Sequence, residues 1–114
     1  MLLEKMLQSQ GFGSRKRCQQ LIKNGAISIH SEVQTDLKCR VDVNGLNFSV
    51  YGQDYTYREK VYIALNKPQG FECSHQPQHH QSVFNLFPEI LRERVLAAVG
   101  RLDQDTTGLL LLTD

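Results

Sequence analysis

The 114-residue sequence has no long hydrophobic run and only three cysteines, and each shortage limits what the chain can be. Its longest uninterrupted apolar runs, such as residues 95–99, have only five residues, whereas a membrane-spanning helix needs about 20 apolar residues, so an integral membrane protein is excluded. Glu4 and Lys5 interrupt the N-terminus where a secretory signal needs an unbroken apolar stretch, so we expect no export signal. An odd number of cysteines without such a signal favours reduced thiols and a cytoplasmic location.

The sequence does contain enough apolar residues for a packed core, and its charge is unevenly distributed. Hydrophobic residues make up 40% and charged residues 22% of the chain. The formal net charge is +1, but residues 1–51 carry seven basic and four acidic side chains, and residues 52–114 carry six basic and eight acidic ones. A basic first half and an acidic second half favour two units with different roles. We therefore predict two domains, residues 1–55 and 56–114.

The first half predicts two short helices followed by a small antiparallel sheet. Apolar residues within 2–7 share one helical face, and the glycines within 11–13 end that helix. Ser14 is placed to cap a second helix, because its hydroxyl can accept a hydrogen bond from a free amide of the first turn. Residues 26–29 alternate as a strand does, and residues 41–50 alternate around an Asn-Gly pair, which predicts a hairpin.

The first turn of the second predicted helix is basic. Arg15, Lys16 and Arg17 oppose the helix dipole there, at a cost of roughly 0.3–1 kcal/mol each where they are exposed. A helix N-terminus with free amides and basic neighbours suits a phosphate, so we interpret Ser14, these three residues and Lys23 as candidate RNA-binding residues. The alternative is an ordinary solvated face.

The second half begins with a strand and a turn. Residues 61–65 are nearly all apolar, which predicts a strand buried on both faces, and residues 66–70 contain the Pro and Gly of a turn. Residues 82–87 predict a helical turn. A short helix is expected over residues 88–94, with its proline at the first position, where the missing N–H costs nothing.

Cys73, His75, His79 and His80 invite comparison with a metal site. Zinc ligands usually occur as closely spaced, repeated pairs, and only one cysteine is present in this segment. We therefore expect a polar surface loop here and no metal.

The most informative segment is residues 100–108, a polar loop bounded by glycines. It lies between the apolar segments 95–99 and 109–113, which predict two strands that support it from both sides. Asp103 and Asp105 are then candidates for a paired acid and base. The alternative is that the second of them only stabilises a turn.

Two resemblances rest on these motifs. The opening of the second helix at Ser14, followed by LIKNGAISI at 21–29, resembles the S4-type RNA-binding module over roughly residues 1–50. The string GRLDQDTTGLLLLTD at 100–114 resembles the signature of the RsuA-type pseudouridine synthases. NKPQG at 66–70 is similar to that family's first catalytic strand and turn, and the order and spacing of all three motifs match.

The resemblance implies an α+β fold, with a small S4-like RNA-binding module followed by the first part of a mixed-sheet pseudouridine synthase catalytic domain. The implied activity is isomerisation of a uridine in rRNA, with most likeness to the branch that acts on uridine 516 of small-subunit (16S) rRNA. Asp103 would be the essential carboxylate when uracil leaves the ribose at N1 and rejoins it through C5. Arg101 would help to hold the flipped nucleotide or would fill its place, while Thr106, Thr107 and Gly108 would shape the loop. The alternative for Arg101 is a surface arginine paired with Asp105.

The resemblance further implies a cytoplasmic monomer with no membrane partner, no metal and no cofactor, acting on 16S rRNA or an assembling small subunit. In the family a larger sheet follows, with a tyrosine that packs on the target base and a basic partner for the catalytic aspartate. We therefore expect an N-terminal fragment that is inactive alone. Two alternatives stay open, a non-catalytic S4-type RNA-binding protein and a structural ribosome-associated protein, although neither needs a carboxylate in residues 100–108.

Overall fold

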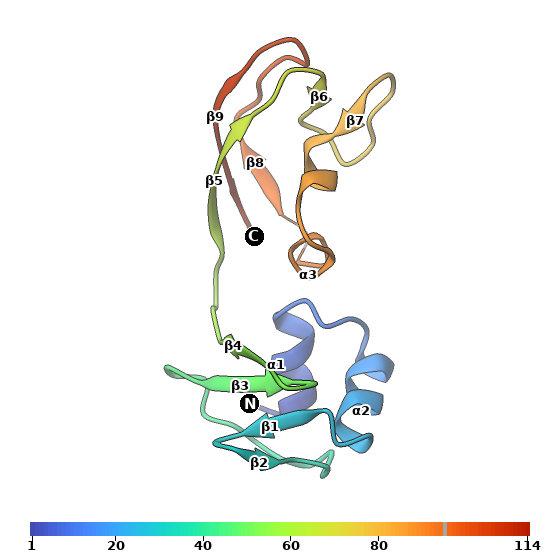
Figure 1. The fold of residues 1–114 in the computed structure, drawn as a ribbon, viewed down its shortest axis with the longest axis vertical. Coiled ribbons are helices and arrows are strands. Elements are labelled where there is room, and N and C mark those ends of the chain that lie inside the picture. The colour runs from blue at the N-terminus through green and yellow to red at the C-terminus, as the bar shows by residue number, and fades with distance from the viewer. Residues whose placement is uncertain (95) are drawn as a thin grey trace. The chain divides into compact units, whose positions relative to one another are not determined.

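The computed structural model describes residues 1–94 and 96–114, and the chain divides into two compact units (Figure 1). Unit 1 is Met1–Glu59 and unit 2 is Lys60–Asp114. Each unit combines short helices with strands, so the α+β class predicted from the sequence is confirmed. No helix in the described part of the chain has the length and apolar character that a bilayer crossing requires.

Unit 1 begins with two helices, α1 (Leu3–Ser9) and α2 (Arg15–Lys23). The Ser14 hydroxyl accepts a hydrogen bond from the Arg17 amide at 3.2 Å, which confirms the predicted helix cap. Beyond the last turn of α2, Gly25 has a φ of +73°, a left-handed conformation that favours glycine and ends the helix where the sequence predicts.

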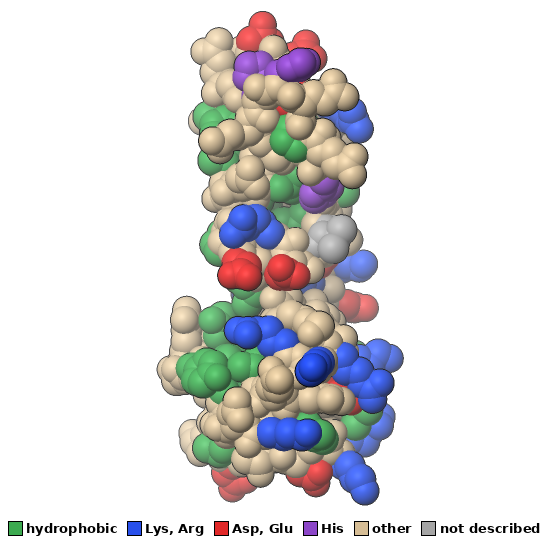
Figure 2. Space-filling model, turned by 90° about the vertical axis from the view of Figure 1, so that its right-hand side faces the viewer, with side chains coloured by type: hydrophobic (Ala, Val, Ile, Leu, Met, Phe, Trp, Pro, Cys, Tyr) green, Lys and Arg blue, Asp and Glu red, His purple; other side chains and the backbone are tan. Residues whose placement is uncertain are grey.

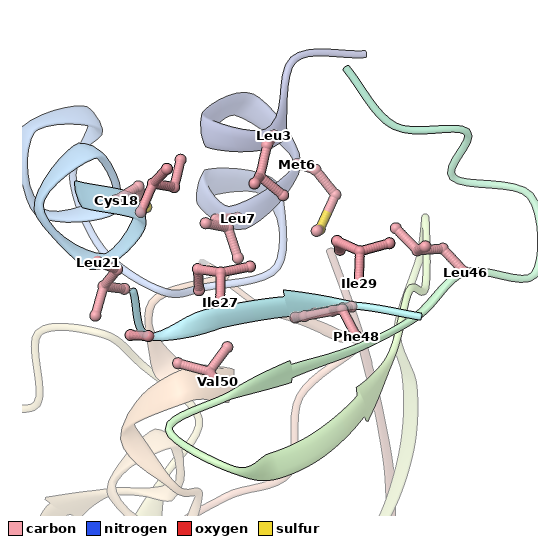
Figure 3. Packing of buried hydrophobic residues seen from close by; sticks show 12 residues of the cluster. Leu3, Met6, Leu7, Cys18, Leu21, Ile27, Ile29, Leu46, Phe48 and Val50 are labelled. Carbon is pink, nitrogen blue, oxygen red and sulfur yellow. The ribbon is translucent and has the colours of Figure 1, made fainter. Parts of the chain in front are cut away.

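The helices of unit 1 pack on a four-stranded antiparallel sheet in the order β2-β1-β3-β4. Its strands are β1 (Ile27–Ile29), β2 (Glu32–Val33), β3 (Asn47–Val50) and β4 (Gln53–Thr56). Side chains of both helices meet those of one sheet face (Figure 3). The buried apolar residues are Leu3, Met6, Leu7, Cys18, Leu21, Ile22, Ala26, Ile27, Ile29, Leu46, Phe48 and Val50. Burial raises the pKa of the Cys18 thiol to about 11, and all three cysteines are free thiols.

The prediction of a β-hairpin around Asn44 and Gly45 is wrong. Residues 41–43 are not a strand, and the Asn-Gly pair instead forms a turn in which the Leu46 amide donates to the Val43 carbonyl at 3.2 Å. The physical reason lies in β3, which pairs with β1 on one side and with β4 on the other. Neither edge of β3 is available to the preceding segment.

Strand β4 lies across the domain boundary that we placed after residue 55. It returns antiparallel to β3 through a turn at Tyr51 and Gly52, whose φ angles are +49° and +80°. Only one residue of β4, Tyr55, packs against the core, so the strand does not need the apolar alternation of a half-buried strand. Periodicity therefore gives no sign of this strand.

Unit 2 is built on a three-stranded antiparallel sheet in the order β5-β9-β8. These strands are β5 (Tyr62–Lys67), β8 (Ala97–Val99) and β9 (Gly108–Thr113). A short parallel pair, β6 (Phe71–Glu72) with β7 (Gln81–Ser82), precedes a 3-10 turn η1 (Val83–Leu86) and the short helix α3 (Glu89–Arg92). The predicted helical turn is confirmed, whereas Pro88 caps α3 and is not its first residue. In the strand predicted over 95–99, Val95 lies outside the described residues.

The core of unit 2 covers only one face of this sheet. Its buried apolar residues are Val83, Phe84, Leu96, Leu110 and Leu112. On the opposite face Tyr62 is 79% and Leu109 is 69% exposed. Residues 61–65 are therefore not buried on both faces as predicted, because η1 and its neighbours cover one side of the sheet alone.

Candidate active site

The candidate loop, residues 100–107, joins β8 to β9 beside the turn that follows β5. The ladder between β5 and β9 places Lys67 opposite Gly108, which brings the end of the loop to that turn. The Gly70 amide donates to the Gln104 carbonyl at 2.6 Å. Within the loop the Thr106 amide donates to the carbonyl of Asp103 at 3.0 Å. The loop is therefore a folded turn attached to its neighbour.

Lys67 is completely buried, and its ammonium group holds the loop from inside. Nζ donates to the carbonyls of Thr106 at 2.9 Å, Asp103 at 3.0 Å and Pro68 at 3.1 Å, with that of Gln104 at 3.4 Å. A buried cation is costly unless hydrogen bonds replace its water, and these carbonyl dipoles do so. One side chain thus fixes the backbone of Asp103 and of the residues that follow it.

Cys73 adds a further contact, since its thiol donates to the Leu102 carbonyl at 3.4 Å. The carbonyls of residues 102, 103, 104 and 106 are all held by the segment 67–73. The side chains of Arg101, Asp103 and Asp105 are exposed. The loop therefore combines a fixed backbone with an accessible carboxylate, the arrangement that positions a reactive group with little loss of freedom on binding.

Of the predicted substrate-binding residues, Arg101, Thr106 and Thr107 belong to this loop, and Gly108 begins β9. Thr106 is half-buried and Thr107 is exposed. Gly108 has a φ of +141°, and an added Cβ would lie 3.9 Å from the Leu102 side chain. Backbone conformation, more than space, therefore favours glycine at the start of β9.

Sequence reasoning missed the role of Lys67, which it assigns only to a turn. The signal is its place in the alternation of β5, where Ile63, Leu65 and Lys67 share the inward face. A lysine in phase with buried residues predicts an ammonium group that must find acceptors inside the fold.

The histidine-containing loop is ordered by one carboxylate, that of Glu72. Its Oε2 accepts hydrogen bonds from the backbone amides of Gln78 at 3.0 Å, His79 at 3.3 Å and His80 at 3.1 Å. The bond from His80 contributes most to holding the pKa of Glu72 below its ordinary value, although partial burial opposes it. Among the described residues, no three His, Cys, Asp or Glu side chains are grouped so as to hold a metal ion.

The opposite end of the sheet is fixed by an ion pair. The Arg94 guanidinium lies 2.6 Å from the Asp114 carboxylate, and the Val61 amide donates to the same carboxylate at 2.9 Å. Burial raises the pKa of Asp114, but these hydrogen bonds outweigh it and leave the pKa below its ordinary value. The hydrogen bond from Val61 joins this residue, which precedes β5, to Asp114, which follows β9.

In unit 1 the predicted RNA-binding side chains are on the surface of α2. Arg15, Lys16, Arg17 and Lys23 are all exposed, and Lys and Arg side chains gather on the side of unit 1 where α2 lies (Figure 2). Arg15 is anchored, because its Nε lies 3.5 Å from the carboxylate of buried Glu4.

Known proteins resemble the chain over its whole length. Residues 61–114 match the family model described as RNA pseudouridylate synthase. The chain is 41% identical over 115 residues to the uncharacterized RNA pseudouridine synthase YtzG of Bacillus subtilis. It is 33% identical over 120 residues to ribosomal small subunit pseudouridine synthase A of Vibrio vulnificus, and 34% identical over 112 residues to ribosomal large subunit pseudouridine synthase B of Bacillus subtilis.

These alignments cover 98–100% of this chain but 45–48% of the relatives, so the chain spans about half the length of the curated relatives it matches. A crystal structure of a pseudouridylate synthase aligns with a TM-score of 0.46 and 28% identity, covering 98% of this chain and 47% of that one. In the family model and in the curated relatives alike, the chain is thus similar to RNA pseudouridine synthases.

Proposed function

We propose that this chain is part of a pseudouridine synthase that isomerises a uridine of small-subunit (16S) rRNA, with Asp103 as the essential carboxylate. The observation that supports this most is the candidate loop itself. Its backbone is held by Lys67, Gly70 and Cys73, while the Asp103 side chain is exposed to a substrate. A loop that served only to connect two strands would need no buried ammonium beneath it.

The proposed reaction breaks the bond between N1 of uracil and C1′ of ribose and forms one from C5 to the same carbon. The product has the atoms of the substrate, with a proton lost from C5 and one gained at N1, so the reaction needs no oxidant and no group donor. An ionised Asp103 attacks the sugar or stabilises the positive charge that develops on it, as carboxylates do in glycoside chemistry. The target base must first leave the helical stack.

Unit 1 supplies RNA affinity in this proposal. Ser14 and the exposed cations Arg15, Lys16 and Arg17 present hydrogen-bond donors and positive charge at the N-terminus of the nine-residue helix α2, and the exposed Lys23 lies in its last turn. Amides of a helix N-terminus and basic side chains both favour phosphate oxygens. This set would hold rRNA by phosphate contacts and by shape.

We expect alanine at Arg15, Lys16 and Arg17 together to weaken RNA binding and to lower the slope of affinity against salt by about one for each phosphate group that these side chains bind. The measurement is binding of a 16S rRNA fragment at several salt concentrations. The matched control removes two other exposed cations of unit 1, through Lys38→Ala and Arg40→Ala. If the control and the triple variant behave alike, the RNA-binding surface lies elsewhere.

The substrate class is tested by direct assay. Residues 1–114 replace the matching half of the Bacillus subtilis relative that is 41% identical, and tritium release from labelled uridine is measured on small-subunit and large-subunit rRNA transcripts. We expect pseudouridine in the small-subunit transcript alone. Conversion of only the large-subunit transcript would move the proposal to that substrate. An inactive chimera beside an active parent would contradict the proposed activity of the chain.

A further inference from the structure

A cavity of about 370 Å³ lies beside the candidate loop, inside unit 2. Its lining includes His75, Gln76, Phe84, Ala98 and Arg101. Arg101 belongs to the candidate loop and stands two positions before Asp103. The volume falls in the lower part of the range of small-molecule sites, about 300–1,000 Å³. The cavity is therefore large enough for a nucleobase and adjoins the loop that carries the proposed chemistry.

The His75 ring in this cavity is fixed on one face and at one edge. It is stacked on the buried ring of Phe84, with centroids 3.7 Å apart and planes inclined by 10°. Its Nε2 lies 2.6 Å from the Leu96 carbonyl, and because a carbonyl only accepts, Nε2 carries the proton. The residue is nevertheless exposed and lines the cavity, so part of the ring surface is accessible. His75 is thus an aromatic surface whose orientation is set before any ligand arrives.

The other polar groups of the cavity complement that surface. The Arg101 guanidinium and the Gln76 amide both line it, and both can donate hydrogen bonds to the carbonyl oxygens at the edge of a base. Proteins recognise unpaired RNA bases by stacking them on aromatic side chains and by bonding their polar edges. A stacking surface with donors beside it is what such a base requires.

We propose that this cavity holds one unstacked base of the RNA, stacked on the accessible surface of the His75 ring with its edge toward Arg101 and Gln76. The proposal rests on the proposed action on RNA and adds a base-binding site to it. A site for phosphate alone would use the guanidinium but would leave the ordered aromatic ring without a purpose. A base site and a phosphate site can therefore be distinguished by whether binding depends on the base of the ligand.

The first test follows the His75 ring protons by NMR in the 114-residue chain during titration with uridine 5′-monophosphate and, separately, ribose 5-phosphate. A base stacked on the ring shifts these protons upfield through its ring current. We expect that shift with the nucleotide and none with the sugar phosphate. Equal shifts with both ligands would indicate a phosphate site and overturn the proposal, as would the absence of any shift with the nucleotide.

The second test separates stacking from a structural role of the ring. His75→Leu removes the aromatic surface, and we expect it to weaken binding of oligouridine by about tenfold, the range that one stacked base contributes. His75→Phe keeps the surface without the bond to Leu96 and should bind like the original. His79→Leu, in the same loop and outside the cavity lining, is the matched control. Equal weakening by the Phe and Leu variants would contradict stacking.

The outcomes remain distinct from those of the proposed function. Asp103→Asn should leave the nucleotide-dependent shift of His75 unchanged, because that carboxylate is not among the residues that line the cavity. An inactive chimera beside an active parent, together with a persistent shift of His75 in the 114-residue chain, would overturn the proposed activity and retain the base site. Normal pseudouridine formation with no shift would do the reverse.

Discussion

Replacing Asp103 with Asn in the active chimera is expected to reduce pseudouridine formation about 10²–10³-fold, the scale on which removal of one transition-state electrostatic interaction is measured. Asn retains the size and hydrogen-bonding capacity of Asp and loses only the negative charge. The backbone of residue 103 should stay in place, because Lys67 binds its carbonyl and not its side chain. RNA affinity should therefore be unchanged, and tritium release measured beside a binding assay separates the two effects.

Asp105→Asn is the matched control for this experiment. Asp105 is also exposed and belongs to the same loop, two positions further on, so both variants remove one negative charge from one surface. We assign Asp105 to loop geometry and expect a milder loss of activity. An inactive Asp105→Asn protein together with an active Asp103→Asn protein would show that the other carboxylate performs the chemistry.

The parts of the fold that local chemistry determines were predictable from the sequence. The cap at Ser14, the end of α2 near Gly25 and the helical turn after Ser82 each depend on a few neighbouring residues. The Asn44-Gly45 pair was as strong a local signal and still predicted the wrong pairing. A turn motif specifies a change of direction, whereas the partner of β3 is decided by which strands reach its two edges.

The candidate site shows the same division between local and long-range information. The glycine-bounded loop and its two carboxylates are visible in the sequence, but the groups that hold the loop come from residues about 30–40 positions away. The contact from Cys73 to the Leu102 carbonyl and those from Lys67 form only when β5 and β9 pair. Spacing along the chain carries no direct sign of such contacts, so the rigidity of the loop could be seen only in the fold.

Replacing Lys67 with Met should destabilise unit 2 by about 3 kcal/mol or more. Met fills a similar volume but cannot donate, so the carbonyls of Thr106 and Pro68 lose the ammonium group, at about 1–3 kcal/mol for each polar group left buried without a partner. The carbonyls of Asp103 and Gln104 also lose it, but they keep the amides of Thr106 and Gly70 as donors. The free energy of unfolding of proteins is about 0.05–0.15 kcal/mol per residue. A unit as small as unit 2 therefore has a total stability of only a few kcal/mol. The substitution should therefore unfold unit 2 or release its loop.

The measurement is urea unfolding followed by backbone amide NMR signals, with the signals of unit 1 as an internal reference. Lys60→Met is the matched control, since Lys60 is an exposed lysine of the same unit and its loss should cost less than about 0.5 kcal/mol. Lys67→Arg should rescue only in part, because the planar guanidinium retains the charge but cannot reproduce the directions of a compact ammonium among several carbonyls. A Lys67→Met protein as stable as the control, with unchanged amide exchange in residues 100–107, would show that the ammonium group does not hold the loop.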